Sequence, residues 1–294
     1  MRFFAFGLAL LAALGCVDAT AAQARDPVPE RVTFDSLDGR TKLVGYLYVP
    51  QGQAKRSHPA VVMMHGRQGA YSDRAHGVYD AHTLSLRHKA WGRIWADAGY
   101  VALLVDGFGP RGYPQGFPKG SYNDRPEELN EVTVRPLDAY AALAYLRARP
   151  DVIGDRIGLQ GWSNGGSAAI STMDAEAPGI NRPTAATGFR AALIFYPACG
   201  LKGHFDERPF APYAPSLLFH GTADEEVSHK RCAALVDKSR ASGGDVQMVT
   251  YKGATHSFDS PSRKRQSVDA NADATEDAIE RSLKFFAQHL GTRY

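Results

Sequence analysis

Residues 157–166 read IGLQGWSNGG, an apolar run that leads into a Gly-x-Ser-x-Gly motif. The segment that follows, up to Met173, is rich in small residues. This order predicts a strand, a sharp turn and the start of a helix, with Ser163 at the turn. Glycine is expected to be required at positions 161 and 165, because a side chain there would block the neighbouring backbone that passes close to the turn. The motif therefore predicts a rigidly held, exposed serine at the carboxyl edge of a parallel sheet.

Length and composition indicate one globular domain. The chain has 294 residues, of which 44% are hydrophobic and 22% charged, and this length suits one sizeable α/β core spanning residues 25–294. The net charge is only +3 and residues 263–265 form the one short basic run, so we expect no nucleic-acid partner. The spacing of the histidines between positions 65 and 88 matches no zinc pattern. We therefore expect neither a metal nor a cofactor.

Residues 1–24 are expected to be a signal peptide. Arg2 precedes an apolar run at 3–14 that is too short for a stable membrane span. Two processing routes remain open: residues 22–24 form an Ala-x-Ala cleavage site, and residues 13–16 resemble a lipoprotein box that would place a lipid on Cys16. Either route predicts an exported protein, periplasmic or secreted, with lipid anchoring through Cys16 as the alternative.

Export changes how the cysteines are interpreted. Beyond Cys16 the chain contains Cys199 and Cys232, and an oxidising compartment favours a disulfide between them. Two buried free thiols are the alternative, because the sequence does not give the distance between their Cα atoms.

The remaining pattern predicts a mostly parallel, doubly wound α/β sheet with helices on both faces. Residues 32–34 and 43–49 flank an Asp-Gly turn and predict an antiparallel pair. Continuous apolar runs at residues 60–65 and 100–106 then predict parallel strands buried on both faces. Further strands are expected at residues 157–162, 191–196, 216–220 and 246–251. Apolar residues at helical spacing separate several of these runs, and a last helix is expected to begin near Asp273 and end at Gly291.

Chemistry in such sheets is expected just beyond the carboxyl ends of the strands. Ser163, Asp224 and His256 each follow a predicted strand. A serine hydroxyl needs an imidazole to accept its proton and a carboxylate to fix the imidazole tautomer. The chain order of serine, acid and histidine is that of α/β-hydrolases. Glu225 and Glu226 are the alternative candidates for the acid.

An acyl-transfer site also needs N–H donors for the oxyanion. The backbone N–H of Asn164 is one candidate, and that of Arg67, in the glycine-flanked loop after the third strand, is the second. Trp162, Arg111 and Tyr71 are candidates for lining the substrate pocket. Arg67 and Arg111 are also considered for contact with an anionic group of the substrate.

These segments resemble the dienelactone hydrolase family of α/β-hydrolases over nearly all of residues 30–290. The resemblance is carried by residues 65–69, 106–112, Arg135, Asp138, 161–166, 221–224 and 256–258. It implies an α/β-hydrolase fold, a Ser163, Asp224 and His256 triad, and oxyanion donors at Asn164 and Arg67. The two later cysteines resemble those of exported members. True dienelactone hydrolases differ in using a cysteine nucleophile and in carrying a glutamate at the position of Gly66.

The sequence thus predicts an exported serine hydrolase that cleaves small carboxylic esters through an acyl-enzyme. A peptidase of the prolyl oligopeptidase type and an acyltransferase are the alternatives on the same triad. A non-catalytic binding module on this fold is the alternative outside the enzymes, because fold does not dictate function.

Overall fold

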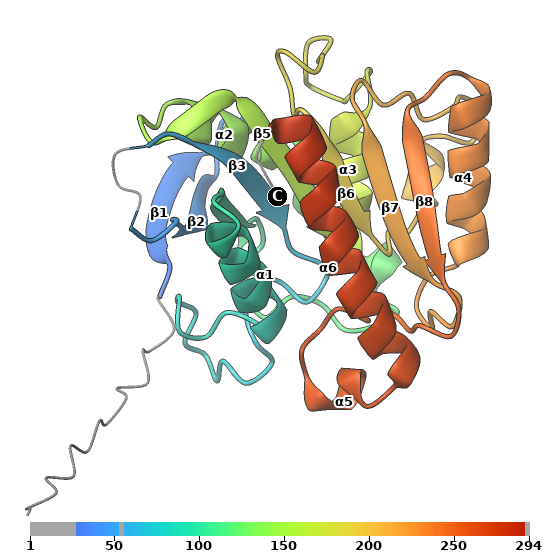
Figure 1. Cartoon of the computed structure of the whole chain (residues 1–294), viewed down its shortest axis with the longest axis horizontal. Helices are drawn as coiled ribbons and strands as arrows, with labels where there is room; N and C mark the ends of the chain where they lie inside the picture. Colours follow the sequence, from blue (N-terminus) through green and yellow to red (C-terminus); the bar gives the residue numbers. More distant parts are fainter. Residues whose placement is uncertain (1–27, 53–55, 292–294) are drawn as a thin grey trace, which may run out of the picture.

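The computed structural model describes residues 28–52 and 56–291, so the predicted signal peptide and Cys16 lie outside the described residues. Its centre is an eight-stranded sheet in the order β1-β2-β4-β3-β5-β6-β7-β8 (Figure 1). The strands are β1 (Glu30–Asp35), β2 (Lys42–Tyr48), β3 (His58–Met64), β4 (Val101–Asp106), β5 (Val152–Trp162), β6 (Ala192–Phe195), β7 (Ser216–Gly221) and β8 (Val246–Tyr251). β2 runs antiparallel to both of its neighbours, and the other pairs are parallel. This topology confirms the predicted fold class.

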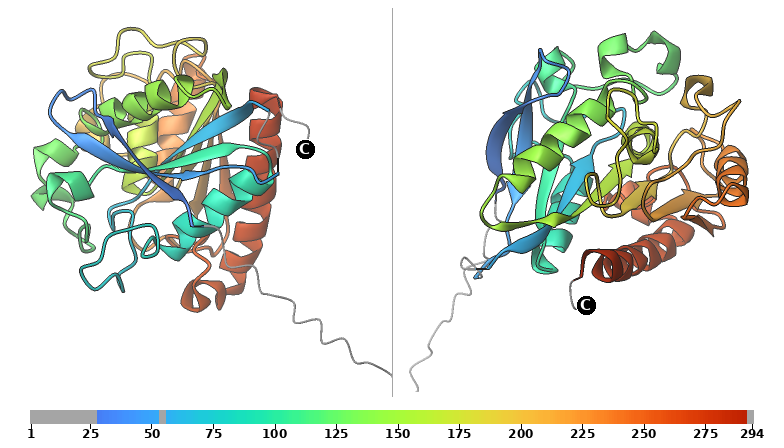
Figure 2. Two further views of the ribbon diagram at one scale, coloured as in Figure 1. Left: turned by 90° about the vertical axis from the view of Figure 1, so that its left-hand side faces the viewer. Right: turned by 90° about the horizontal axis from the view of Figure 1, so that it is seen from above.

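Helices cover both faces of the sheet (Figures 1 and 2). They are α1 (Leu86–Asp97), α2 (Arg135–Arg147), α3 (Asn164–Met173), α4 (His229–Ala241), α5 (Arg263–Gln266) and α6 (Asp269–Leu290). Short 3-10 turns lie in the connections at Gly109–Arg111, Tyr122–Asp124, Glu127–Leu129 and Leu201–Gly203. Among the described helices, none is long and apolar enough to cross a membrane.

Two apolar layers separate the helices from the sheet. One contains buried side chains of α1 and α6, and the other contains those of α2, α3 and α4. β3 and β4 are buried along their whole length, as expected for parallel strands covered on both faces. Gly158 of β5 shows how close the packing is, because a Cβ there would lie 2.7 Å from the ring of Phe286 on α6. The sheet therefore holds the loops at its carboxyl edge on a rigid base.

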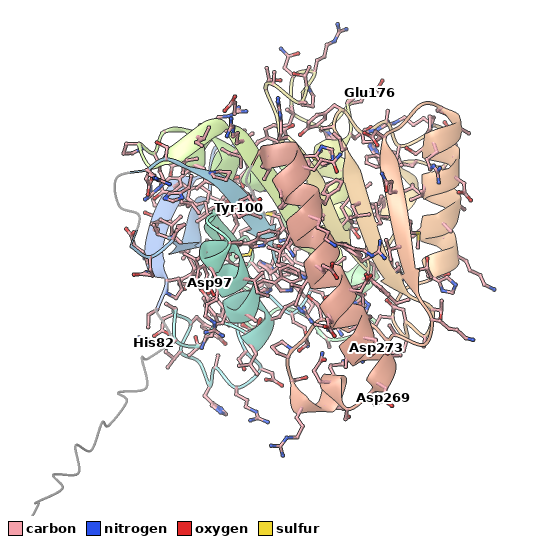
Figure 3. All side chains as sticks on the ribbon, in the orientation of Figure 1. His82, Asp97, Tyr100, Glu176, Asp269 and Asp273 are labelled. Atoms are coloured by element: carbon pink, nitrogen blue, oxygen red, sulfur yellow. A yellow bond between two sulfur atoms is a disulfide. The ribbon has the colours of Figure 1, made fainter. Side chains whose placement is uncertain are left out.

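Three helices differ from the sequence prediction, and one of them is the short α5, which was not predicted. α4 was not predicted, because most of its residues are polar; its buried side chains, Cys232, Leu235, Val236 and Ser239, nevertheless follow helical spacing. α6 begins at Asp269, one turn before the predicted start near Asp273 (Figure 3). A carboxylate in the first turn of a helix is favoured by the helix dipole, which suits the earlier start.

The structure contains the Cys199–Cys232 disulfide, which joins the loop after β6 to helix α4. The two Cα atoms lie 5.1 Å apart, within the range that a disulfide spans. The bond encloses β7 and the loop that carries Asp224, so it limits how far that loop can move from β6.

We expect the double variant Cys199→Ala/Cys232→Ala to lose about 3 to 4 kcal/mol of unfolding free energy. The bond closes a loop of 33 residues, and the chain-entropy model gives this magnitude for such a loop. Urea denaturation of the variant and of the oxidised wild type measures the difference. Equal midpoints and slopes for the two proteins would contradict this role of the disulfide.

Candidate active site

Ser163 occupies a strained turn between β5 and α3. Its backbone has φ 52° and ψ −116°, a conformation that a residue with a side chain rarely adopts. A Cβ on Gly161 would lie 2.1 Å from the carbonyl oxygen of Gly165, and a Cβ on Gly165 would lie 2.1 Å from that of Met64. Only glycine fits at either position, as the sequence predicted. The turn, which has the geometry of a nucleophile elbow, holds the Ser163 hydroxyl at the carboxyl edge of the sheet.

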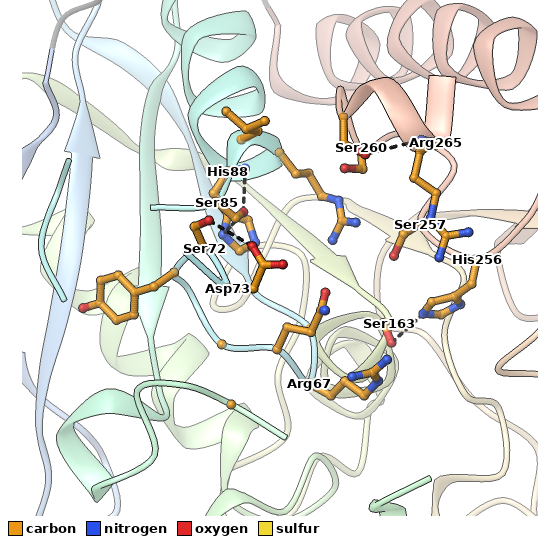
Figure 4. A pocket seen from close by; sticks show the side chains of 18 of the residues that line it. Arg67, Ser72, Asp73, Ser85, His88, Ser163, His256, Ser257, Ser260 and Arg265 are labelled. Carbon is orange, nitrogen blue, oxygen red and sulfur yellow. Dashed lines mark hydrogen bonds between the residues drawn. The ribbon is translucent and has the colours of Figure 1, made fainter. Parts of the chain in front are cut away.

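Three side chains from three different loops form a continuous hydrogen-bonded relay. Ser163 Oγ lies 3.1 Å from His256 Nε2, and His256 Nδ1 lies 2.8 Å from Asp224 Oδ2. Figure 4 shows the Ser163 hydroxyl and the His256 ring facing each other, with Arg67 beside them. Asp224 follows β7, and His256 lies in the loop after β8. This geometry suits proton transfer from the hydroxyl to the imidazole.

Asp224 is held as a carboxylate. Burial opposes its ionisation, but the hydrogen bond with His256 and the backbone N–H groups of Val227 and Glu226 together lower its pKa below the usual value. The two N–H groups donate to Oδ1 at 2.9 and 2.8 Å, which leaves Oδ2 for the imidazole. An ionised acceptor at Nδ1 fixes the tautomer in which Nε2 is free to accept a proton.

The two neighbouring glutamates occupy other positions around His256. Glu225 Oε2 accepts the backbone N–H of His256 at 2.9 Å, and Oε1 pairs with Arg265 at 2.9 Å. Glu226 lies on the opposite side of the ring, with Oε2 3.7 Å from Nε2. Of the three acids proposed from the sequence, Asp224 is thus the one placed at Nδ1.

The two predicted oxyanion donors are the backbone N–H groups of Asn164, the residue after Ser163, and of Arg67, in the loop after β3. Neither has a hydrogen-bond partner within the described residues. The loop after β3 lies directly against the elbow, because a Cβ on Gly66 would lie 3.1 Å from the carbonyl oxygen of Trp162. Phe117 fixes Arg67 from the other side: its N–H donates to the Arg67 carbonyl, and its carbonyl accepts from Arg67 Nη1, both at 2.8 Å. Both candidate donors are therefore held before any substrate binds.

Arg135, which the sequence marked only through the family resemblance, links these two loops. Its buried Nη1 donates to the carbonyl of His65 and to Asn164 Oδ1, both at 2.7 Å. Asn164 Nδ2 in turn donates to Glu131 at 3.2 Å. The first residue of α3 and the end of β3 are thus tied to one guanidinium.

The buried carboxylate of Asp259 organises the wall behind His256, and sequence reasoning missed it. Its oxygens lie next to four donors: Trp91 Nε1 and Trp162 Nε1, each at 2.8 Å, the Tyr196 hydroxyl, and Arg87 Nε at 3.2 Å. The Tyr196 ring packs edge-on against the His256 ring at 4.8 Å between centroids. Asp259 follows His256 by only three residues, and this closeness to a predicted catalytic residue was the available sequence signal.

A cavity of about 650 Å³ opens beside Ser163 and His256. Its wall includes Ser72, Asp73, Ser85 and His88 across from the reactive pair (Figure 4). Arg87, Lys264 and Arg265 also line it. No group of three or more histidine, cysteine, aspartate or glutamate side chains suited to holding a metal occurs among the described residues.

Two of the three predicted pocket residues lie elsewhere. Trp162 is fully buried, and its indole N–H is directed to Asp259. The Arg111 side chain is only 5% exposed. Its Nη atoms donate to Asp138 at 2.8 Å and to Asp38 at 2.6 Å, so it ties the loop after β4 to α2 and to the β1–β2 turn and is directed away from the cavity residues. Tyr71 does line the cavity, although its hydroxyl is directed to a buried aspartate.

Comparison with known proteins agrees with this fold. The sequence profile of the dienelactone hydrolase family matches residues 43–290. The chain belongs to the dienelactone hydrolase family. This membership confirms the resemblance seen in the sequence.

Two curated relatives align with parts of the chain. A probable 2-oxo-3-(5-oxofuran-2-ylidene)propanoate lactonase of Bradyrhizobium sp. is 28% identical over 170 residues, which cover 55% of this chain and 64% of the lactonase. Human dipeptidyl peptidase 8 is 26% identical over 255 residues, which cover 79% of this chain and 26% of the peptidase. The chain thus spans less than two thirds of each relative.

Solved structures with the same fold include esterase 2 of Thermogutta terrifontis phosphorylated by paraoxon. It has a TM-score of 0.61 and 22% identity, covering 90% of this chain and 95% of the esterase. A putative dienelactone hydrolase of Klebsiella pneumoniae has a TM-score of 0.65 and 17% identity, covering 88% and 99% of the two chains. At these identities the matches establish the α/β-hydrolase fold.

Proposed function

We propose that this protein is a serine hydrolase that cleaves carboxylic esters through an acyl-enzyme on Ser163. The observation that carries the proposal is the relay from Ser163 through His256 to Asp224 at the wall of an open cavity. A partly exposed serine on a sharp strand-to-helix turn, hydrogen-bonded to an imidazole at the edge of a cavity, has the geometry that acyl transfer requires.

In the first half-reaction, Ser163 Oγ attacks the ester carbonyl while His256 Nε2 takes its proton. The carbonyl oxygen becomes an oxyanion between the N–H groups of Arg67 and Asn164, and one such donor is typically worth about 3 kcal/mol. His256 then gives its proton to the departing alkoxide, which leaves as the alcohol. In the second half-reaction, water attacks the acyl-enzyme, His256 accepts its proton, and the acid is released.

Small, compact esters suit this site best. The cavity is bounded by short segments, among them the polar pair Ser72 and Asp73 and the glycine- and proline-containing residues 115–118. Such a wall offers no long apolar tunnel for a fatty acyl chain. The Bradyrhizobium relative is named a lactonase, and a lactone is a cyclic ester. Structures of the Thermogutta esterase include propionate- and butyrate-bound forms. These neighbours support short acyl groups as the substrate class.

The same triad in a peptidase is the second candidate, favoured by the match to dipeptidyl peptidase 8 across 79% of this chain. An acyltransferase that excludes water is the third.

The disulfide between Cys199 and Cys232 supports an exported location, because such bonds persist in oxidising compartments. We further propose residues 25–294 as one domain that follows the signal peptide.

We expect p-nitrophenyl esters of short acids to be cleaved much faster than those of long-chain acids and than aminoacyl p-nitroanilides. Amide cleavage requires protonation of a poor leaving group and precise positioning of a peptide. Steady-state kinetics on both substrate series tests this. Anilide rates equal to ester rates would favour the peptidase, and a protein that a fluorophosphonate does not label would favour a binding module.

A further inference from the structure

Glu226 is placed at the reactive end of His256 but has no part in the relay. Its Oε2 lies 3.7 Å from Nε2, the atom that exchanges a proton with Ser163. The side chain is 13% exposed, and Glu226 lines the same cavity as the reactive pair. The carboxylate therefore faces the space where the second half-reaction takes place.

Arg67 keeps Glu226 ionised and fixes its orientation. Burial opposes ionisation, but the hydrogen bonds from Arg67 and the positive charges nearby lower the pKa of Glu226 below its usual value. The guanidinium is bidentate, with Nη2 2.7 Å from Oε1 and Nε 2.9 Å from Oε2. A carboxylate oxygen can accept more than one hydrogen bond, so Oε2 can still accept one from the cavity.

We propose that Glu226 orients the water that hydrolyses the acyl-enzyme, an inference that rests on the proposed function. The separation of 3.7 Å between Oε2 and Nε2 is too long for a direct hydrogen bond. One water can donate a hydrogen to each of the two atoms, and such a bridge is nearly as favourable as a direct bond. Its oxygen then faces the carbonyl carbon of the ester on Ser163.

The step balances without another reactant. The water oxygen bonds to the acyl carbon while one of its protons passes to His256 Nε2 and the other stays hydrogen-bonded to Glu226. The carbonyl becomes the oxyanion. When the intermediate collapses, the bond from carbon to Ser163 Oγ breaks and His256 returns its proton to Oγ. The carboxylic acid leaves with the hydroxyl that came from water.

This role affects one half-reaction only. In acylation, Ser163 gives its proton directly to His256 across 3.1 Å, and no water takes part. A carboxylate that only stabilised the imidazolium would influence both halves, because the imidazolium forms in both. A carboxylate that only held Arg67, and with it one oxyanion donor, would also influence both. Selective loss of deacylation therefore distinguishes a water-orienting Glu226 from these other effects.

The test compares Glu226→Gln with wild type in two measurements. The rate of Ser163 labelling by a fluorophosphonate reports attack by the serine and does not require the water. Turnover of p-nitrophenyl acetate, with intact-mass detection of the acetyl-enzyme, reports deacylation. We expect labelling within about threefold of wild type, deacylation slower by roughly ten- to a hundredfold, and accumulation of the acetyl-enzyme.

Three further variants make the result decisive. Glu276→Gln, an exposed glutamate on α6, is the matched control and keeps both rates. Glu226→Asp keeps the charge but withdraws the carboxylate by one methylene, and we expect the acetyl-enzyme to accumulate there as well. Arg67→Met is expected to slow labelling and turnover together. Equal loss of labelling and deacylation in Glu226→Gln would overturn the inference, whereas a wild type that is neither labelled nor acetylated would overturn the proposed function itself.

Discussion

Ser163→Ala and His256→Ala are each expected to lower kcat for p-nitrophenyl acetate by roughly 10⁶-fold, the size of loss seen when a serine hydrolase loses its nucleophile or its base. Without Ser163 no acyl-enzyme forms, and without His256 the hydroxyl at 3.1 Å has no acceptor for its proton. Because serine and histidine act as one unit, the double variant is expected to be no worse than either single variant.

The controls for these variants are Ser242→Ala and His82→Ala, an exposed serine at the end of α4 and an exposed histidine in the loop before α1. Both are expected to keep wild-type turnover. Circular dichroism and thermal melting show whether each variant is folded. A folded Ser163→Ala protein that retains a tenth of wild-type turnover would rule out the proposed nucleophile.

The elbow was predictable because its requirements are local. A strand that turns sharply into a helix needs glycine where an added Cβ would lie only 2.1 Å from a backbone oxygen, and the sequence shows these glycines on both sides of Ser163. The central strands β3 and β4 were predictable for a similar reason, since burial on both faces leaves a continuous apolar run. The loops that carry Asp224 and His256 were predictable because each residue lies a few positions beyond the end of a predicted strand.

The sequence did not show whether a given side chain near the site faces the cavity or the core. Trp162 is adjacent to the nucleophile, but side chains alternate across a sheet, and its ring lies in the buried layer with Trp91 and Phe195. Arg111 was expected to face the substrate because its loop is at the correct edge. Its partner Asp38 lies 73 positions away in the chain, so nothing near Arg111 in the sequence reveals the pairing.

The contacts of Asp259 were even less predictable from the sequence than the pairing of Arg111. The donors on Trp91, Trp162 and Tyr196 are separated from Asp259 by 168, 97 and 63 positions. Each is an aromatic residue that the sequence explains equally well as apolar core. Only the folded sheet shows that their polar atoms converge on one carboxylate behind the histidine. Tertiary convergence of this kind cannot be obtained from local spacing in a single sequence.

Asp224→Asn is expected to give a folded protein whose turnover is lower by about 10⁴-fold. The amide has nearly the shape of the carboxylate and can still accept the backbone N–H groups of Glu226 and Val227, so the loop is expected to keep its conformation. An amide NH₂ directed at His256 Nδ1, however, favours the tautomer with its proton on Nε2. That tautomer cannot accept the proton of Ser163.

The loss in Asp224→Asn should appear equally in fluorophosphonate labelling and in ester turnover, because the imidazole is needed in both half-reactions. Asp97→Asn, an exposed aspartate at the end of α1 (Figure 3), serves as the matched control and is expected to change neither rate. Glu226→Gln provides the contrast, since it is expected to retain labelling and lose only deacylation. If Glu226→Gln instead abolished labelling while Asp224→Asn stayed active, the acid of the triad would be Glu226, and the 2.8 Å contact between Asp224 and His256 would have only a structural role.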